Sequence, residues 1–175
     1  PLHTTANHNG QLTGQEGIHG FWESRLPELL ADKEWDLLTG TADYLKHPLT
    51  YIWDRTLESA AAADSVLSLE RLVNSRFPAD RKYAFEERNG QLVRSYSTSY
   101  SIAYHRLLAE MPERRMRQSI LSVASFWFTA WVNAGQPSLS ALLPGSMAET
   151  ERTSLDSLER SWRAGKILGK SCEAP

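Results

Sequence analysis

The sequence predicts an all-α protein, and three observations lead to this fold class. Apolar residues recur at intervals of three and four over long stretches, which is the period of an amphipathic helix. Prolines stand where helices are expected to begin, at Pro48 and Pro112. Only one short segment, residues 82–97, carries a strand-like pattern. We therefore predict a single domain of four or five helices around one core.

The first sixteen residues are rich in Thr, Asn, Gly and Gln, and this composition predicts an exposed loop. A helical stretch opens at Gly17 and runs towards Leu30. Pro27 is expected to kink or break this stretch, because proline has no backbone N–H to donate within a helix.

Pro48 is well placed as the first residue of a long helix that continues to about Arg76, where Phe77-Pro78 ends it. Its apolar stripe contains one charged member, Glu70. The other members are Leu49, Ile52, Trp53, Thr56, Leu57, Ala60, Ala63, Val66, Leu67 and Val73.

Asn89-Gly90 lies between two short apolar runs and fits a hairpin with a type I′ turn, although the charged flanks fit an irregular excursion almost as well. Ser97 or Ser99 can cap the following helix. The helix from Pro112 is apolar around much of its circumference, with Phe126 and Trp127 side by side. This pattern predicts a central, well-buried helix.

We predict a helical domain over residues 1–143 and a linker with a polar C-terminal tail over residues 144–175. Within that tail, residues 147–170 are expected to form a docked or frayed helix. The net charge of −2 argues against a dedicated duplex-DNA binder, and 41% apolar residues argue against a disordered chain. No run of eighteen apolar residues is present, so no transmembrane segment is expected.

Histidines supply the candidate chemistry. His19 and Glu23 are four residues apart, which places both side chains on one face of a helix. With His3 from the preceding loop they form a His2Glu set, and three protein ligands with an open fourth position are typical of catalytic zinc. The alternative is a surface pair worth a few tenths of a kcal/mol. His8 is expected to face solvent, His47 to mark a helix entry and His105 to lie on the surface.

The segments Pro1-Leu2-His3 and Gly17-Ile18-His19-Gly20-Phe21-Trp22-Glu23 resemble the end of the metal-site signature of the zinc-dependent phospholipase C superfamily. This superfamily also contains the trinuclear-zinc single-strand nucleases, and its members are helical. The signature reads His-x3-Asp-x3-Pro-x-His, then a loop, then His-x3-Glu or His-x3-Asp. The resemblance implies that His3, His19 and Glu23 ligate one zinc ion.

The chain departs from this signature at its beginning, where the His-x3-Asp half is absent. In the family, the remaining ligands of a three-zinc cluster and the expected general base lie upstream of the Pro-x-His element. The resemblance therefore implies that this chain carries one zinc site of three. It also implies that the N-terminal helices of the domain, and so a missing upstream part of the same domain, precede Pro1.

The function implied by the resemblance is phosphodiester hydrolysis by metal-activated water, with a phospholipase C-like activity on phospholipids. Glu23 favours that branch, since the nucleases more often carry aspartate at this position. Single-strand nuclease activity is one alternative, and a non-catalytic helical binding module is another. The resemblance further implies a secreted or periplasmic protein.

Overall fold

The computed structural model describes residues 1–88, 90–142, 147–164 and 166, and most of them are helical. The one sheet in these residues is a two-stranded hairpin. The predicted all-α class therefore holds for the bulk of the described chain, with the hairpin as an exception. The elements are α1 (Ile18–Gly20), α2 (Leu26–Glu34), α3 (Pro48–Arg76), β1 (Tyr83–Arg88), β2 (Gln91–Tyr96), α4 (Thr98–Leu107), α5 (Met111–Asn133) and α6 (Glu149–Arg163).

A π-helical turn, Phe21–Arg25, joins α1 to α2 into one continuous helix. Within this turn the Leu26 N–H donates to the carbonyl of Phe21, five residues earlier. Pro27 is the second residue of α2. Of the kink or break predicted at Pro27, the break is wrong, because the helix continues through the proline. The helix widens ahead of the proline, and this wider turn accommodates the missing donor.

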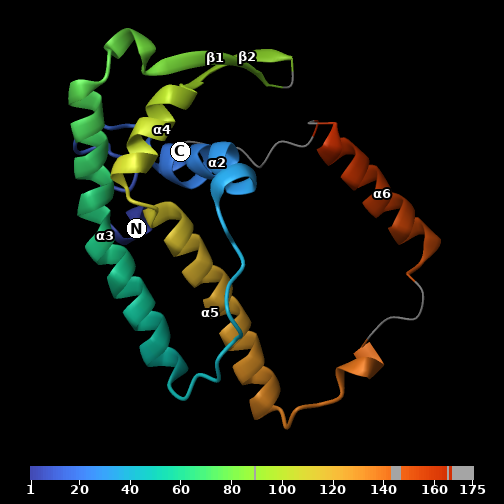
Figure 1. The fold of residues 1–175 in the computed structure, drawn as a ribbon. Helices are drawn as coiled ribbons and strands as arrows, with labels where there is room; N and C mark the ends of the chain where they lie inside the picture. Colours follow the sequence, from blue (N-terminus) through green and yellow to red (C-terminus); the bar gives the residue numbers. More distant parts are fainter. Residues whose placement is uncertain (89, 143–146, 165, 167–175) are drawn as a thin grey trace.

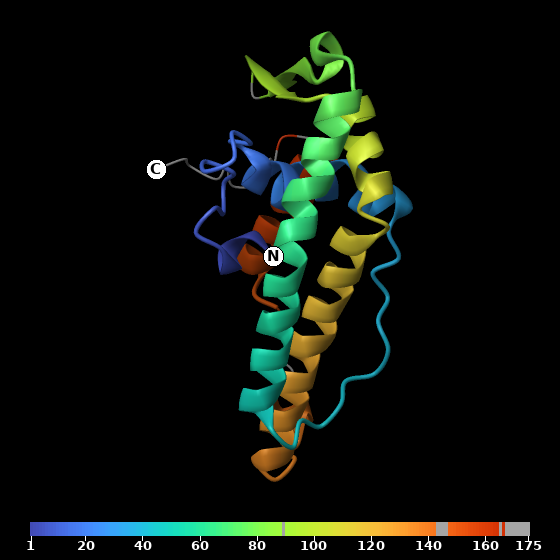
Figure 2. The ribbon, with the colours of Figure 1, turned by 90° about the vertical axis from the view of Figure 1, so that its left-hand side faces the viewer.

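Helices α3 and α5 run antiparallel along the length of the molecule (Figures 1 and 2). Their contact includes a hydrogen bond of 3.0 Å between the hydroxyls of Tyr51 and Ser122. Between α2 and α3, the extended residues 35–47 lie along α5, where the Leu45 N–H donates to the Thr129 hydroxyl at 2.8 Å. Helix α3 has the bounds that its sequence predicts.

The hydrophobic core lies where α2, α4 and the C-terminal half of α3 meet, in the upper part of Figure 1. Phe21 is central to it: its ring stacks on Tyr96 with centroids 3.9 Å apart and on Tyr104 at 5.0 Å. The core cluster comprises Leu2, Ile18, Phe21, Trp22, Leu26, Leu30, Trp35, Val66, Val73, Tyr100, Tyr104 and Leu108.

The prediction that α5 is a well-buried central helix is wrong. Trp127 is 75% exposed, and the residues that α5 buries are Pro112, Ser125 and Thr129. The physical reason is that α2, α3 and residues 35–47, the described segments that contact α5, leave one of its faces uncovered, and residues 43–45 contact it through hydroxyl groups. The first half of the α3 stripe is open as well, with Trp53 58% exposed.

The hairpin is antiparallel, with Tyr83 opposite Tyr96 and Arg88 opposite Gln91. Asn89, on which the predicted turn type depends, lies outside the described residues. Buried Arg25 ties the hairpin to the helix before α2, donating to the Tyr96 carbonyl at 3.1 Å and to the Glu86 carboxylate at 3.0 Å.

The predicted tail contains one described helix, α6, which is exposed along residues 149–160 and is drawn apart from the other helices in Figure 1. The predicted linker at Pro144-Gly145 falls within residues 143–146, which lie outside the described residues, as does the tail beyond Lys166. None of the described helices is both long enough and apolar enough to span a membrane.

Candidate metal centre

Each of the three predicted ligands stands next to a buried apolar neighbour that fixes its position. His3 follows Leu2 in a 3-10 turn that packs against α3, and Leu2 is fully buried. The other two ligands lie on the α1–α2 helix. His19 follows buried Ile18, and Glu23 follows buried Trp22 in the π-helical turn. The apolar side chains enter the core, so the three polar side chains remain on the outer face.

The structure brings these three side chains together. The Nε2 atoms of His3 and His19 are 3.1 Å apart, and the Glu23 Oε2 atom lies 3.1 Å from the first and 3.0 Å from the second. Their three ligand atoms form a nearly equilateral triangle. Across the part of the chain that the structure describes, this is the one cluster of His, Cys, Asp and Glu whose ligand atoms converge closely enough to hold a metal ion.

Hydrogen bonding does not account for this triangle. Each Nε2 atom carries at most one hydrogen, and an ionised carboxylate carries none. At most two of the three contacts can therefore be hydrogen bonds. If both Nε2 atoms donate to Glu23, the remaining contact places two N–H groups against each other. A cation bound to all three atoms would satisfy every contact at once.

The spacing also suits zinc. Ligand atoms at about 2.0–2.1 Å from a tetrahedral zinc ion lie about 3.3–3.4 Å from one another, so only small shifts would be needed to accept the ion. Two nitrogens and one carboxylate oxygen form a usual zinc ligand set. The residues present therefore fit a zinc ion, and His3 among them is exposed to solvent.

The other histidines do not join this group. His8 is exposed, as predicted, and its ring centroid lies 6.1 Å from that of His19. His47 precedes α3, where its carbonyl accepts the N–H of Tyr51, as expected of a helix-entry residue. The prediction of a surface position for His105 is wrong. Its ring is half-buried and lies 6.0 Å from that of Trp35.

A second polar cluster has the carboxylate of Glu70 at its centre. Glu70 of α3 is 2% exposed and accepts hydrogen bonds from Tyr100 at 2.6 Å, Gln15 at 2.6 Å and Lys82 at 3.1 Å. Burial and the Glu70 carboxylate raise the pKa of the Tyr100 hydroxyl, so that it remains a donor. The sequence signals this cluster only through a single charged residue in an apolar stripe.

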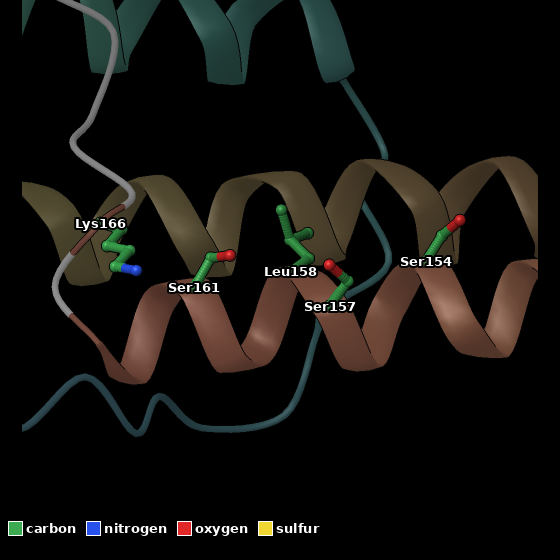
Figure 3. Close-up of a pocket in the computed structure, with 5 residues that line it drawn as sticks. All are labelled: Ser154, Ser157, Leu158, Ser161 and Lys166. Carbon is green, nitrogen blue, oxygen red and sulfur yellow. The ribbon is translucent and has the colours of Figure 1, made fainter.

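A surface hollow lies along α6, lined by Ser154, Ser157, Leu158, Ser161 and Lys166 (Figure 3). It contains none of the three metal-centre residues and no histidine, acidic or thiol group. We therefore assign the candidate chemistry to His3, His19 and Glu23.

Comparison of the chain with protein-family models, with curated proteins and with solved structures finds no match. The fold and the site define a class: a mainly helical protein whose described residues include a three-residue group able to hold a metal ion.

Proposed function

We propose that this protein binds zinc through His3, His19 and Glu23 and acts as a phospholipase C-like, zinc-dependent phosphodiester hydrolase. The observation that carries the proposal is the convergence of three ligand atoms within 3.1 Å of one another. The resemblance of residues 1–23 to the metal-site signature of the phospholipase C superfamily supports the reaction type. In that superfamily this ligand set holds one ion of three.

When bound, zinc would supply Lewis-acid activation of water and of the phosphoryl group. The chain's own residues hold the ion and leave a path to it. Ile18 and Trp22 fix the helix face that carries His19 and Glu23, while exposed His3 borders the open side. Two neutral imidazoles and one carboxylate leave a divalent ion with a net positive charge, which favours an anionic phosphodiester.

Hydrolysis of bis(p-nitrophenyl) phosphate with and without added zinc tests the reaction. We expect zinc-dependent hydrolysis by the unmodified chain. With Glu23→Ala or His19→Ala, hydrolysis should be no faster than with free zinc ions alone. Glu34→Ala, which removes an exposed carboxylate at the end of α2, is the matched control and should retain the unmodified rate. A chain that binds zinc but hydrolyses no faster than Glu23→Ala would contradict the hydrolase proposal.

The substrate is part of the proposal as well. We propose a phospholipid headgroup ester, because the carboxylate at position 23 is glutamate, as in the phospholipase C branch. Parallel assays on phosphatidylcholine vesicles and on single-stranded DNA would test this choice. Faster cleavage of DNA would favour the nuclease alternative.

One observation favours a second function. Trp53 and Trp127 expose most of their surface on α3 and α5, which suits a helical module that binds a partner through its apolar faces. Such a module would use the metal centre for structure only. Zinc binding without hydrolysis of any of the three substrates would favour it.

A further inference from the structure

Gln15 lies in the loop between His3 and His19 and forms hydrogen bonds through both its backbone and its side chain. The Gln15 N–H donates to the Gly10 carbonyl at 2.9 Å. Gly10 has a φ of +76°, and a Cβ atom there would lie 2.3 Å from the Gln15 carbonyl oxygen. The two backbones therefore approach more closely than any residue with a side chain at position 10 would permit.

The Gln15 side chain reaches α3. Its Nε2 atom donates to the Leu67 carbonyl at 2.8 Å and to the Glu70 carboxylate at 2.6 Å. Its Oε1 atom is buried and has no hydrogen-bond partner among the described residues, which is unfavourable for folding. Because of this unpaired oxygen, local stability alone does not favour glutamine at position 15. The Gln15 amide therefore serves mainly to tie the loop to α3.

Glu70 is a rigid partner for this amide. Tyr100 of α4 and Lys82 hold the same carboxylate from other directions, and Lys82 supplies the positive charge that makes its burial tolerable. A carboxylate held by two groups outside the loop does not follow the loop if the loop moves. The Glu70 side chain therefore sets the place of Gln15.

Gln15 also contacts the helix that carries two of the three predicted metal ligands. Its carbonyl accepts the N–H of Ile18 at 3.1 Å, at the first turn of α1, and His19 is the next residue. A continuous path of hydrogen bonds thus runs from Glu70 through Gln15 to the start of the helix that carries His19 and Glu23.

We propose that Gln15 is a positioning residue of the metal centre, anchored by Glu70, which holds His19 and Glu23 where they meet His3. This inference rests on the metal binding proposed above. Gln15 touches no ligand atom in this role. It acts by fixing the helix that presents two of the three ligands.

Two substitutions separate positioning from general stability. Gln15→Met removes the hydrogen bonds of Gln15 to the Leu67 carbonyl and to Glu70 and so releases the loop. Tyr104→Phe removes a buried hydrogen bond of 2.7 Å to the Val66 carbonyl, which is not part of this path. We expect Gln15→Met to weaken zinc binding by about 10–100-fold, as loss of outer contacts to metal ligands commonly does. Tyr104→Phe should retain the zinc affinity of the unmodified chain, even where urea unfolding shows a similar loss of stability.

Zinc affinity is measured by competition with a chromophoric chelator, and the absorption spectrum of bound cobalt(II) reports the ligand geometry independently of activity. Gln15→Asn, whose amide is one methylene too short to reach Glu70, is a second variant with the same expectation if Gln15→Met does not fold. Equal zinc affinity in the Gln15 variants and the unmodified chain, or equal weakening in Tyr104→Phe, would overturn the inference. Failure of the unmodified chain to bind zinc would instead contradict the proposed function.

Discussion

At the scale of single residues, the metal centre depends on an alternation of buried and exposed neighbours. Leu2, Ile18 and Trp22 enter the core, and the residue that follows each of them is a candidate ligand. The apolar residue sets the direction of its neighbour, because adjacent side chains in a helical turn point to different sides. Core packing therefore determines the ligand geometry.

Gly10 provides a test of the close approach in the loop. A Cβ atom at position 10 would meet the Gln15 backbone as well as requiring a positive φ, so we expect Gly10→Ala to lower the free energy of unfolding by about 1–3 kcal/mol. Gly14→Ala is the matched control. Gly14 also has a positive φ, but a Cβ atom there would touch nothing within 4 Å, so its cost should be smaller. Urea unfolding that gives equal costs would contradict the account of this loop.

The sequence predicts the metal-centre residues but not the residues that support them. His19 and Glu23 share a face because helical spacing dictates it, and the Pro-x-His element supplies His3. Glu70 accepts from Gln15, 55 residues earlier, and from Tyr100, 30 residues later. No local pattern links such distant positions, so this cluster could not be predicted from spacing.

At the scale of the elements, helix ends are the features that the sequence predicts best. Pro48 begins α3, and Ser97 caps α4 by accepting the N–H of Tyr100, both as expected from local chemistry. The π-helical turn before Pro27 was not predicted. A helix can accommodate a missing N–H by a break, a kink or a wider turn. Here the wider turn forms, and its residues Phe21 and Trp22 pack into the core.

The attachment of the hairpin to the helix before α2 predicts a dependence of stability on pH. Burial would raise the pKa of the Glu86 carboxyl, but hydrogen bonds and positive charge from Arg25 and Arg88 outweigh burial and lower this pKa. A lowered pKa in the folded state contributes stability above the unfolded pKa of about 4.3, and this contribution is lost as the pH falls below it. Glu86→Gln should therefore lose less stability than the unmodified chain between about pH 6 and pH 3.

Urea unfolding followed by circular dichroism at the two pH values measures this difference. Glu87→Gln, at the neighbouring exposed position of β1, is the control and should retain the dependence of the unmodified chain. The same loss of stability in Glu86→Gln and in the unmodified chain would show that the ion pair with Arg25 does not hold the hairpin.

At the scale of the whole molecule, burial is uneven along the long helices. The C-terminal half of α3 contributes Val66 and Val73 to the core, whereas its N-terminal half and much of α5 expose apolar side chains. Periodicity predicts that a face is apolar, but whether that face is covered depends on which other elements pack there. For this reason the prediction of a buried α5 was wrong although its helical extent was nearly right.

Two large-to-small substitutions test this distribution of the core. Trp127→Ser removes a large but mostly exposed side chain, so the free energy of unfolding should change by no more than about 0.5 kcal/mol. Leu26→Ala removes a fully buried side chain and should cost about 2–5 kcal/mol. Chemical unfolding of both variants measures the contrast. A large loss in Trp127→Ser would mean that α5 is covered in solution.

The proposed function depends on a zinc ion that His3, His19 and Glu23 hold together. Equilibrium dialysis against zinc, with the metal content measured by mass spectrometry, tests it most directly. We expect one zinc ion per unmodified chain and loss of that ion in both His19→Ala and Glu23→Ala, with Glu34→Ala unaffected. A stoichiometry below about half an equivalent in the unmodified chain, or unchanged zinc content in the two ligand variants, would contradict it.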